Sequence, residues 1–112
     1  MLTPKKVLRT MEEYSLTQAV VCVGAQAAAG DGEEVSEPKF SKWMRGCAEF
    51  SPDALRRIEV SLAALANVCH DGHPWPLDFR SPKMVPLIKK YVAQHEAYLL
   101  EKAVEDERAA TA

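Results

Sequence analysis

The side chains best suited to chemistry lie in residues 36–46, SEPKFSKWMRG, where polar and basic residues alternate with apolar ones at helical spacing. On a helix, Phe40, Trp43 and Met44 would share one side. The opposite side would carry the polar residues of the segment, which are Glu37, Lys39, Ser41, Lys42 and Arg45. In DNA complexes lysine and arginine contact phosphates or guanine edges, and serine contacts either. The segment therefore predicts a short helix that fits the major groove.

The charge of this segment is opposite in sign to that of the whole chain. Three basic residues and one acidic residue give residues 36–46 a net charge of +2, whereas 14 basic and 16 acidic residues give the 112-residue chain −2. The overall acidity excludes a uniformly basic coat for nucleic acid but permits a local basic surface. Arg56 and Arg57, in the next expected helix, would extend that surface.

Start and stop signals predict the helices that position this segment. A hydroxyl residue followed closely by proline occurs at Thr3, Ser36, Ser51 and Ser81, where the hydroxyl caps the first turn and proline lacks the N–H that would stay unpaired. Apolar residues then recur every three or four positions. We expect an all-α, five-helix small domain with a long C-terminal helix and no obligatory sheet. Its helices are expected at residues 4–14, 18–29, 36–45, 52–68 and 82–107.

The second helix, the connector after residue 68 and the C-terminal tail need separate comment. The valine-rich residues 20–23 also fit a short buried strand, and a kink at Gly24 would divide the second helix. The connector that follows residue 68 is rich in proline, and Trp75 is expected to anchor it to the core. The polar tail at residues 105–112 is expected to fray.

Several short motifs resemble the helix-turn-helix regulators related to phage Cro and repressor proteins, the Xre family. VSEPKFSKWMRG at residues 35–46 is similar to the recognition helix of that family. LTQ at residues 16–18 resembles the start of its first motif helix, and SPDALRRIE at residues 51–59 resembles the helix that follows the recognition helix. The family joins its two motif helices by a turn of about three or four residues. The stretch from Gly24 to Val35 is longer, so either the first motif helix or the loop must be extended.

The resemblance implies roles for individual residues. Ser36 would cap the recognition helix and touch a phosphate, and Phe40 and Trp43 would pack beneath it. Gln18 would cap the first motif helix or touch a backbone phosphate at its start. The implied DNA-binding set is Gln18, Ser36, Glu37, Pro38, Lys39, Ser41, Lys42 and Arg45.

Patterns for other chemistries are weaker. Cys69, His70 and His73 have the spacing Cys-His-x-x-His but lack the second pair of ligands that a zinc site needs. No catalytic motif surrounds Cys22 or Cys47, the glycines do not form a phosphate-binding loop, and the carboxylates form no paired motif. We therefore expect neither an enzyme nor a bound cofactor or metal.

The C-terminal helix carries an apolar stripe that suits packing or pairing. Its members, at steps of three or four, are Val85, Ile88, Val92, His95 and Leu99. Such a stripe either closes the core of its own chain or pairs with a second copy. Because dimeric helix-turn-helix proteins read two half-sites, we predict a homodimer formed by these five residues, with core packing as the alternative.

These patterns predict a sequence-specific transcriptional regulator of phage or mobile-element type that reads double-stranded DNA with residues 36–45. Residues 1–68 would form the helix-turn-helix core, and residues 69–112 the connector and the packing or dimerisation helix of the same domain. The alternative is a protein-binding adaptor, such as an antitoxin or a phage-encoded inhibitor of a host protein, because the chain is acidic and contains the loop GDGEE at residues 30–34. The odd number of scattered cysteines and the absence of an apolar run of about 18 residues favour the cytoplasm, without membrane contact.

Overall fold

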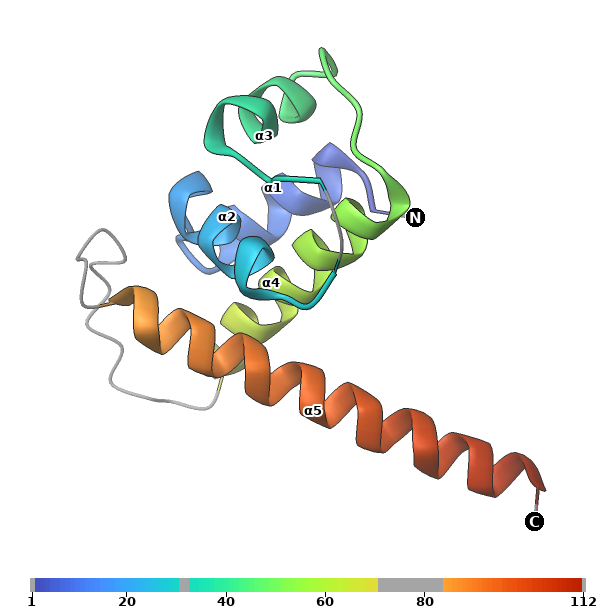
Figure 1. Cartoon of the computed structure of the whole chain (residues 1–112). Coiled ribbons are helices and arrows are strands. Elements are labelled where there is room, and N and C mark those ends of the chain that lie inside the picture. The colour runs from blue at the N-terminus through green and yellow to red at the C-terminus, as the bar shows by residue number, and fades with distance from the viewer. Residues whose placement is uncertain (1, 31–32, 71–83, 112) are drawn as a thin grey trace.

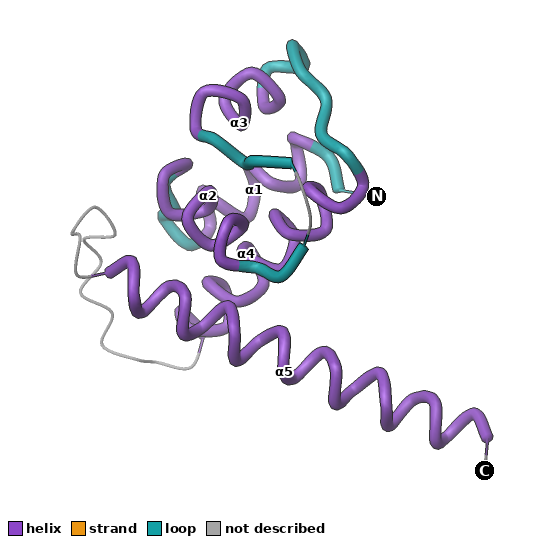
Figure 2. The backbone as a smooth tube through the Cα atoms, in the orientation of Figure 1, coloured by secondary structure: helices purple, strands orange, loops and turns teal. Residues whose placement is uncertain are grey.

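The computed structural model describes residues 2–30, 33–70 and 84–111, which form five α-helices (Figure 1). The helices are α1 (Pro4–Glu13), α2 (Gln18–Ala27), α3 (Glu37–Met44), α4 (Pro52–His70) and α5 (Met84–Thr111). Figure 2 shows helices and loops but no strand in this part of the chain. The predicted all-α fold is confirmed, and the strand alternative for residues 20–23 is wrong.

Two helices form the centre of the bundle. α2 contacts α3, α4 and α5, whereas α4 contacts α1, α2 and α5; α1 also contacts α3. The first half of α5 crosses α2 and α4, and its second half extends beyond the other helices (Figure 1). α3 therefore lies at one end of the bundle and the C-terminal half of α5 at another.

The predicted caps Thr3, Ser36 and Ser51 start helices as expected, and Thr17 caps α2 in the same way; Ser81 lies outside the described residues. The hydroxyl of each cap residue accepts a hydrogen bond from the backbone N–H three residues later, and this satisfies one of the unpaired donors of the first turn. The pairs are Thr3 with Lys6 at 3.3 Å, Thr17 with Val20 at 3.3 Å, Ser36 with Lys39 at 3.4 Å and Ser51 with Ala54 at 3.1 Å. Gly46, with φ +77°, supplies the left-handed turn after α3.

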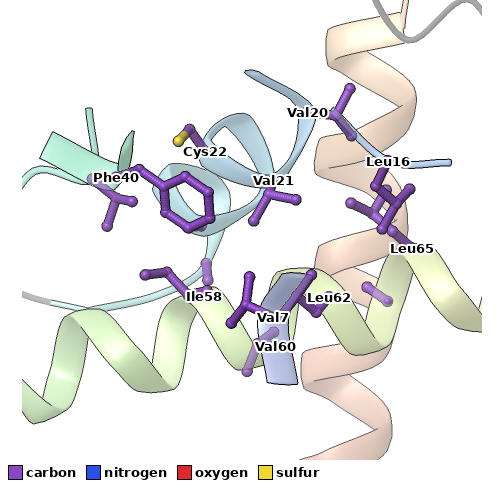
Figure 3. Packing of buried hydrophobic residues seen from close by; sticks show 14 of the residues in the cluster. Val7, Leu16, Val20, Val21, Cys22, Phe40, Ile58, Val60, Leu62 and Leu65 are labelled. Atoms are coloured by element: carbon purple, nitrogen blue, oxygen red, sulfur yellow. The ribbon is translucent and has the colours of Figure 1, made fainter. Parts of the chain in front are cut away.

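The buried core draws on all five helices. Figure 3 shows Val7 of α1, Val21 of α2, Phe40 of α3 and Ile58 of α4 directed into one cluster. Ile88 of α5, with 1% of its surface exposed, belongs to the same cluster. The core is therefore continuous between the expected helix-turn-helix region and the C-terminal helix.

Several helix boundaries differ from expectation. α2 is one helix without a break at Gly24, and it ends at Ala27. α5 continues to Thr111, beyond the expected end at residue 107, because the strong helix formers of the tail extend the last turns. α4 continues to His70, whereas the positions of His73 and Trp75 lie outside the described residues.

Candidate nucleic-acid interface

α3 is held to the bundle by the aromatic side predicted from the sequence. Phe40 is fully buried and Trp43 is 6% exposed. The Trp43 ring lies between Phe40 and Phe50, with centroid distances of 5.9 and 5.8 Å. These contacts fix the rotation of α3 about its own axis, so the opposite side must face solvent.

The solvent-facing side of α3 presents two cations. Lys42 and Arg45 are both exposed, and Ser41, one turn before Arg45, is half-buried. Arg45 Nε donates a long hydrogen bond of 3.4 Å to the carbonyl of Ser41. Within the described residues, no carboxylate lies within ion-pair distance of Lys42 or Arg45. Glu37 and Pro38 are exposed in the first turn, so the face is mixed rather than purely basic.

Lys39 is not part of this face. Its ammonium pairs with the Glu33 carboxylate and lies 5.1 Å from the centre of the Phe50 ring. Both interactions hold the cation against the protein. The charge of Lys39 therefore stabilises the loop that precedes α3, and this arrangement gives no support to its predicted DNA contact.

Glu33 joins that loop to the start of α4. One carboxylate oxygen pairs with Lys39, and the other accepts a hydrogen bond of 2.8 Å from the backbone N–H of Ser51. The hydrogen bond from Lys39, followed by those from Ser51, lowers the pKa of Glu33 to about 2. The carboxylate is thus ionised at neutral pH, and its negative charge compensates the positive charge of Lys39.

Both arginines of α4 donate to acceptors of their own chain, and the burial of Arg57 corrects the expectation that it extends the basic surface, whereas Arg56 is exposed. Arg57 is only 5% exposed, donates from Nε to Asp53 at 3.1 Å and also donates to the carbonyl of Glu33. Arg56 donates to Asp53 at 3.0 Å and to the carbonyl of Ala29. The Asp53–Arg57 pair was visible in the sequence as an i,i+4 spacing, whereas no local signal pointed to Glu33.

The connection between α2 and α3 spans residues 28–36 and is much longer than the turn of the resembled family. Of the two alternatives, the expanded loop is therefore correct and the lengthened helix is wrong. Gln26 Nε2 donates to the carbonyl of Val35 at 2.8 Å. The Glu96 carboxylate of α5 accepts two contacts of 3.1 Å from the N–H of Ala29. Side chains from two helices thus fasten both ends of the loop.

Two other predicted DNA contacts lie at the starts of helices. Gln18 is half-buried in the first turn of α2, where Thr17 already caps the helix. Ser36 caps α3 through its hydroxyl. The structure therefore brings Ser41, Lys42 and Arg45 together on one exposed face and assigns Ser36 a capping role.

The predicted dimerisation stripe is divided by the fold. Ile88 and Val92 are 1% and 0% exposed inside their own chain, so the dimer prediction is corrected for these two residues and core packing is right. His95 is half-buried, with Nδ1 lying 3.3 Å from Nδ2 of Asn67, and burial lowers its pKa. Val85 is half-buried, whereas Leu99 remains 39% exposed.

Two further searches concern the part of the chain that the structure describes. None of its helices combines the length and apolar character that crossing a bilayer requires. Among the same residues, no three histidine, cysteine, aspartate or glutamate side chains lie close enough to hold a metal ion.

Comparison with known proteins adds no relative. No protein-family model matches the chain, and neither curated proteins nor solved structures give a significant match.

Proposed function

We propose that this chain binds double-stranded DNA through the exposed face of α3 and acts as a regulator of the Cro and repressor kind. One observation carries the proposal: α3 buries Phe40 and Trp43 while Lys42 and Arg45 face solvent without a described acidic partner. Cations that no carboxylate neutralises are the side chains that phosphates attract. The role proposed is non-catalytic and cytoplasmic, and control would operate through occupancy of an operator.

The geometry limits how many phosphates α3 can neutralise. With Lys39 engaged by Glu33, two cations per copy remain on the face, Lys42 and Arg45. Each neutralised phosphate contributes about −0.9 to the slope of log affinity against log salt, so α3 would contribute about −2. Glu37 on the same helix opposes non-specific attraction to DNA, which favours recognition of particular sites over general coating.

Binding of the full chain to mixed-sequence duplex DNA, followed by fluorescence polarisation across a salt series, tests the proposal. The test variant combines Lys42→Ala with Arg45→Ala. The control combines Lys89→Ala with Lys102→Ala, because both lysines are exposed on α5 and their removal changes the net charge equally. We expect the test variant to lower the salt slope by about two and weaken binding at low salt by at least about tenfold, and the control to bind like the wild type.

Equal effects of the two double variants would refute the proposal, because binding would then follow net charge rather than α3. Lys39→Ala distinguishes the role of the α2–α3 loop in folding from the role of the exposed face of α3 in DNA binding. We expect it to lower the folding stability while the salt slope of binding stays unchanged, since Lys39 pairs with Glu33. The absence of binding at low salt, together with co-purification of a stoichiometric protein, would favour the adaptor alternative.

A further inference from the structure

α5 has a second apolar face that the fold leaves uncovered. Ala93, Ala97, Leu100 and Val104 follow one another at steps of four, three and four, and all four are exposed. We call these four residues the outer stripe. At about 100° per residue, they lie between about a third and a half of a turn away from Ile88, which faces the core. The outer stripe is therefore distinct from the surface that α5 buries in its own chain.

The outer stripe has the spacing of a helix that pairs with another helix. Apolar residues at alternating steps of three and four give the 3.5-residue repeat of coiled coils. Leu100 and Val104 are 70% and 48% exposed, and they lie on the half of α5 that extends beyond the bundle (Figure 1). Helical segments without tertiary contacts are marginally stable in water. A partner on this face would stabilise the extended half.

The sizes of the side chains suit a second copy of α5 running in the opposite direction. The small residues Ala93 and Ala97 come first in the stripe, and the larger Leu100 and Val104 follow. In an antiparallel pair centred between residues 97 and 100, Ala93 lies opposite the partner's Val104, and Ala97 lies opposite the partner's Leu100. Each small residue then meets a large one, which lets the layers interdigitate.

The charges favour the same direction. Lys89 and Lys90 precede the outer stripe, and the acidic residues 105–107 follow it. Antiparallel pairing brings Lys90 next to the acidic run of the partner. A parallel pair would place Lys90 beside Lys90 of the partner and the two acidic runs side by side, which is repulsive.

From this size and charge complementarity, we propose that the outer stripe is the interface of a homodimer in which two α5 helices pair in antiparallel orientation. The partner helix lies beside α5 and leaves the contacts of Ile88 and Val92 with the core intact. The proposal is independent of DNA binding, because α3 contributes nothing to this face.

Sedimentation equilibrium of the full chain over a hundredfold range of concentration tests the interface. Leu100→Glu places a charge in the stripe. Leu8→Glu is the matched control, because Leu8 is 47% exposed on α1, away from α5. We expect dimers for the wild type and for Leu8→Glu, and at least a tenfold increase in the dimer dissociation constant for Leu100→Glu. A cooperative unfolding transition in urea, like that of the wild type, verifies that the helical bundle of each variant is folded.

A monomeric wild type throughout this range, or equal dissociation constants for the two variants, would overturn the proposal. This outcome also leaves the DNA-binding test unaffected, so the two proposals fail separately.

Disulfide trapping tests the orientation. In a background with Cys47→Ser and Cys69→Ser, chains carrying Ala93→Cys are mixed with chains carrying Val104→Cys. We expect a disulfide between the two kinds of chain and none between two copies of either kind. In the antiparallel pair, two copies of residue 93 are separated by about 16 Å along the axis, beyond the roughly 7 Å that a disulfide spans between Cα atoms. Disulfides between like chains would overturn the antiparallel arrangement.

Discussion

Replacing Gly24 by alanine perturbs the point where α2, α4 and α5 meet. A Cβ atom at this position would lie 2.1 Å from Oγ and 3.0 Å from Cβ of Ser61, and 3.5 Å from Cγ2 of Val92. Ser61 is fully buried, and its hydroxyl donates to the carbonyl of Val21 at 2.9 Å. The hydroxyl can make room only by losing that hydrogen bond or by moving α4 away from α2.

Two opposing effects set the size of the change. In an open helix, replacing glycine by alanine raises the free energy of unfolding by about 1 kcal/mol. Overpacking of a buried contact costs about 1–3 kcal/mol, and a buried hydroxyl that loses its partner costs about 1–3 kcal/mol more. The unfavourable effects are larger in sum, so we expect Gly24→Ala to lower the free energy of unfolding by about 1–5 kcal/mol.

Urea denaturation followed by circular dichroism measures this change, and a double-mutant cycle identifies its cause. Ser61→Ala removes the Oγ atom that lies 2.1 Å from the new Cβ. We expect Gly24→Ala to cost about 1–2 kcal/mol less in the Ser61→Ala background, because the closest contact is then absent. An increase in stability for Gly24→Ala alone, or the same cost in both backgrounds, would refute the close packing of α2 against α4.

Two other predictions concern the titratable groups. The pKa of Glu33 is about 2 in the fold against an ordinary 4.5, so the ionised carboxylate stabilises the fold above pH 4.5, and this contribution is lost as the pH falls from 4.5 towards 2. Urea titrations at several pH values measure the free energy of unfolding. We expect this free energy to fall less between pH 4.5 and 2 in Glu33→Gln than in the wild type, and identical pH profiles would contradict the pairing with Lys39. Burial raises the pKa of the Cys22 thiol to about 12, whereas Cys47 is exposed. With Cys47 and Cys69 replaced by serine, we expect Cys22 not to react with Ellman's reagent until the chain is unfolded in urea. A variant that retains Cys47 is expected to react at once. A fast reaction of Cys22 in the folded chain would contradict its burial.

The secondary structure and one side of the candidate site were predictable from the sequence because their causes are local. The hydroxyl of Ser36 caps the helix only three residues away, and the spacing of Phe40 and Trp43 defines the buried side of that helix. Gly46 ends the helix by its own backbone freedom. Such signals act within one or two turns, so they can be read from neighbouring residues.

The charges of the site were not predictable in this way, because their partners come from distant parts of the chain. The sequence presents Lys39 and Arg57 as exposed cations, yet Glu33 and the backbone carbonyl of the same residue engage them across the loop. The effective charge of α3 is therefore smaller than the segment indicates.

The same division applies to α5. Periodicity predicts a long helix with a wide apolar surface, because both properties depend on residues a few positions apart. The choice between core and solvent depends on where α2 and α4 lie, and this buries Val92 while leaving Leu100 exposed. The local spacing of apolar residues thus accounts for the helices and for their amphipathic character. The side that meets the core, the cations that remain on the surface and the contact that joins Ala29 to Glu96 arise only when distant segments pack together.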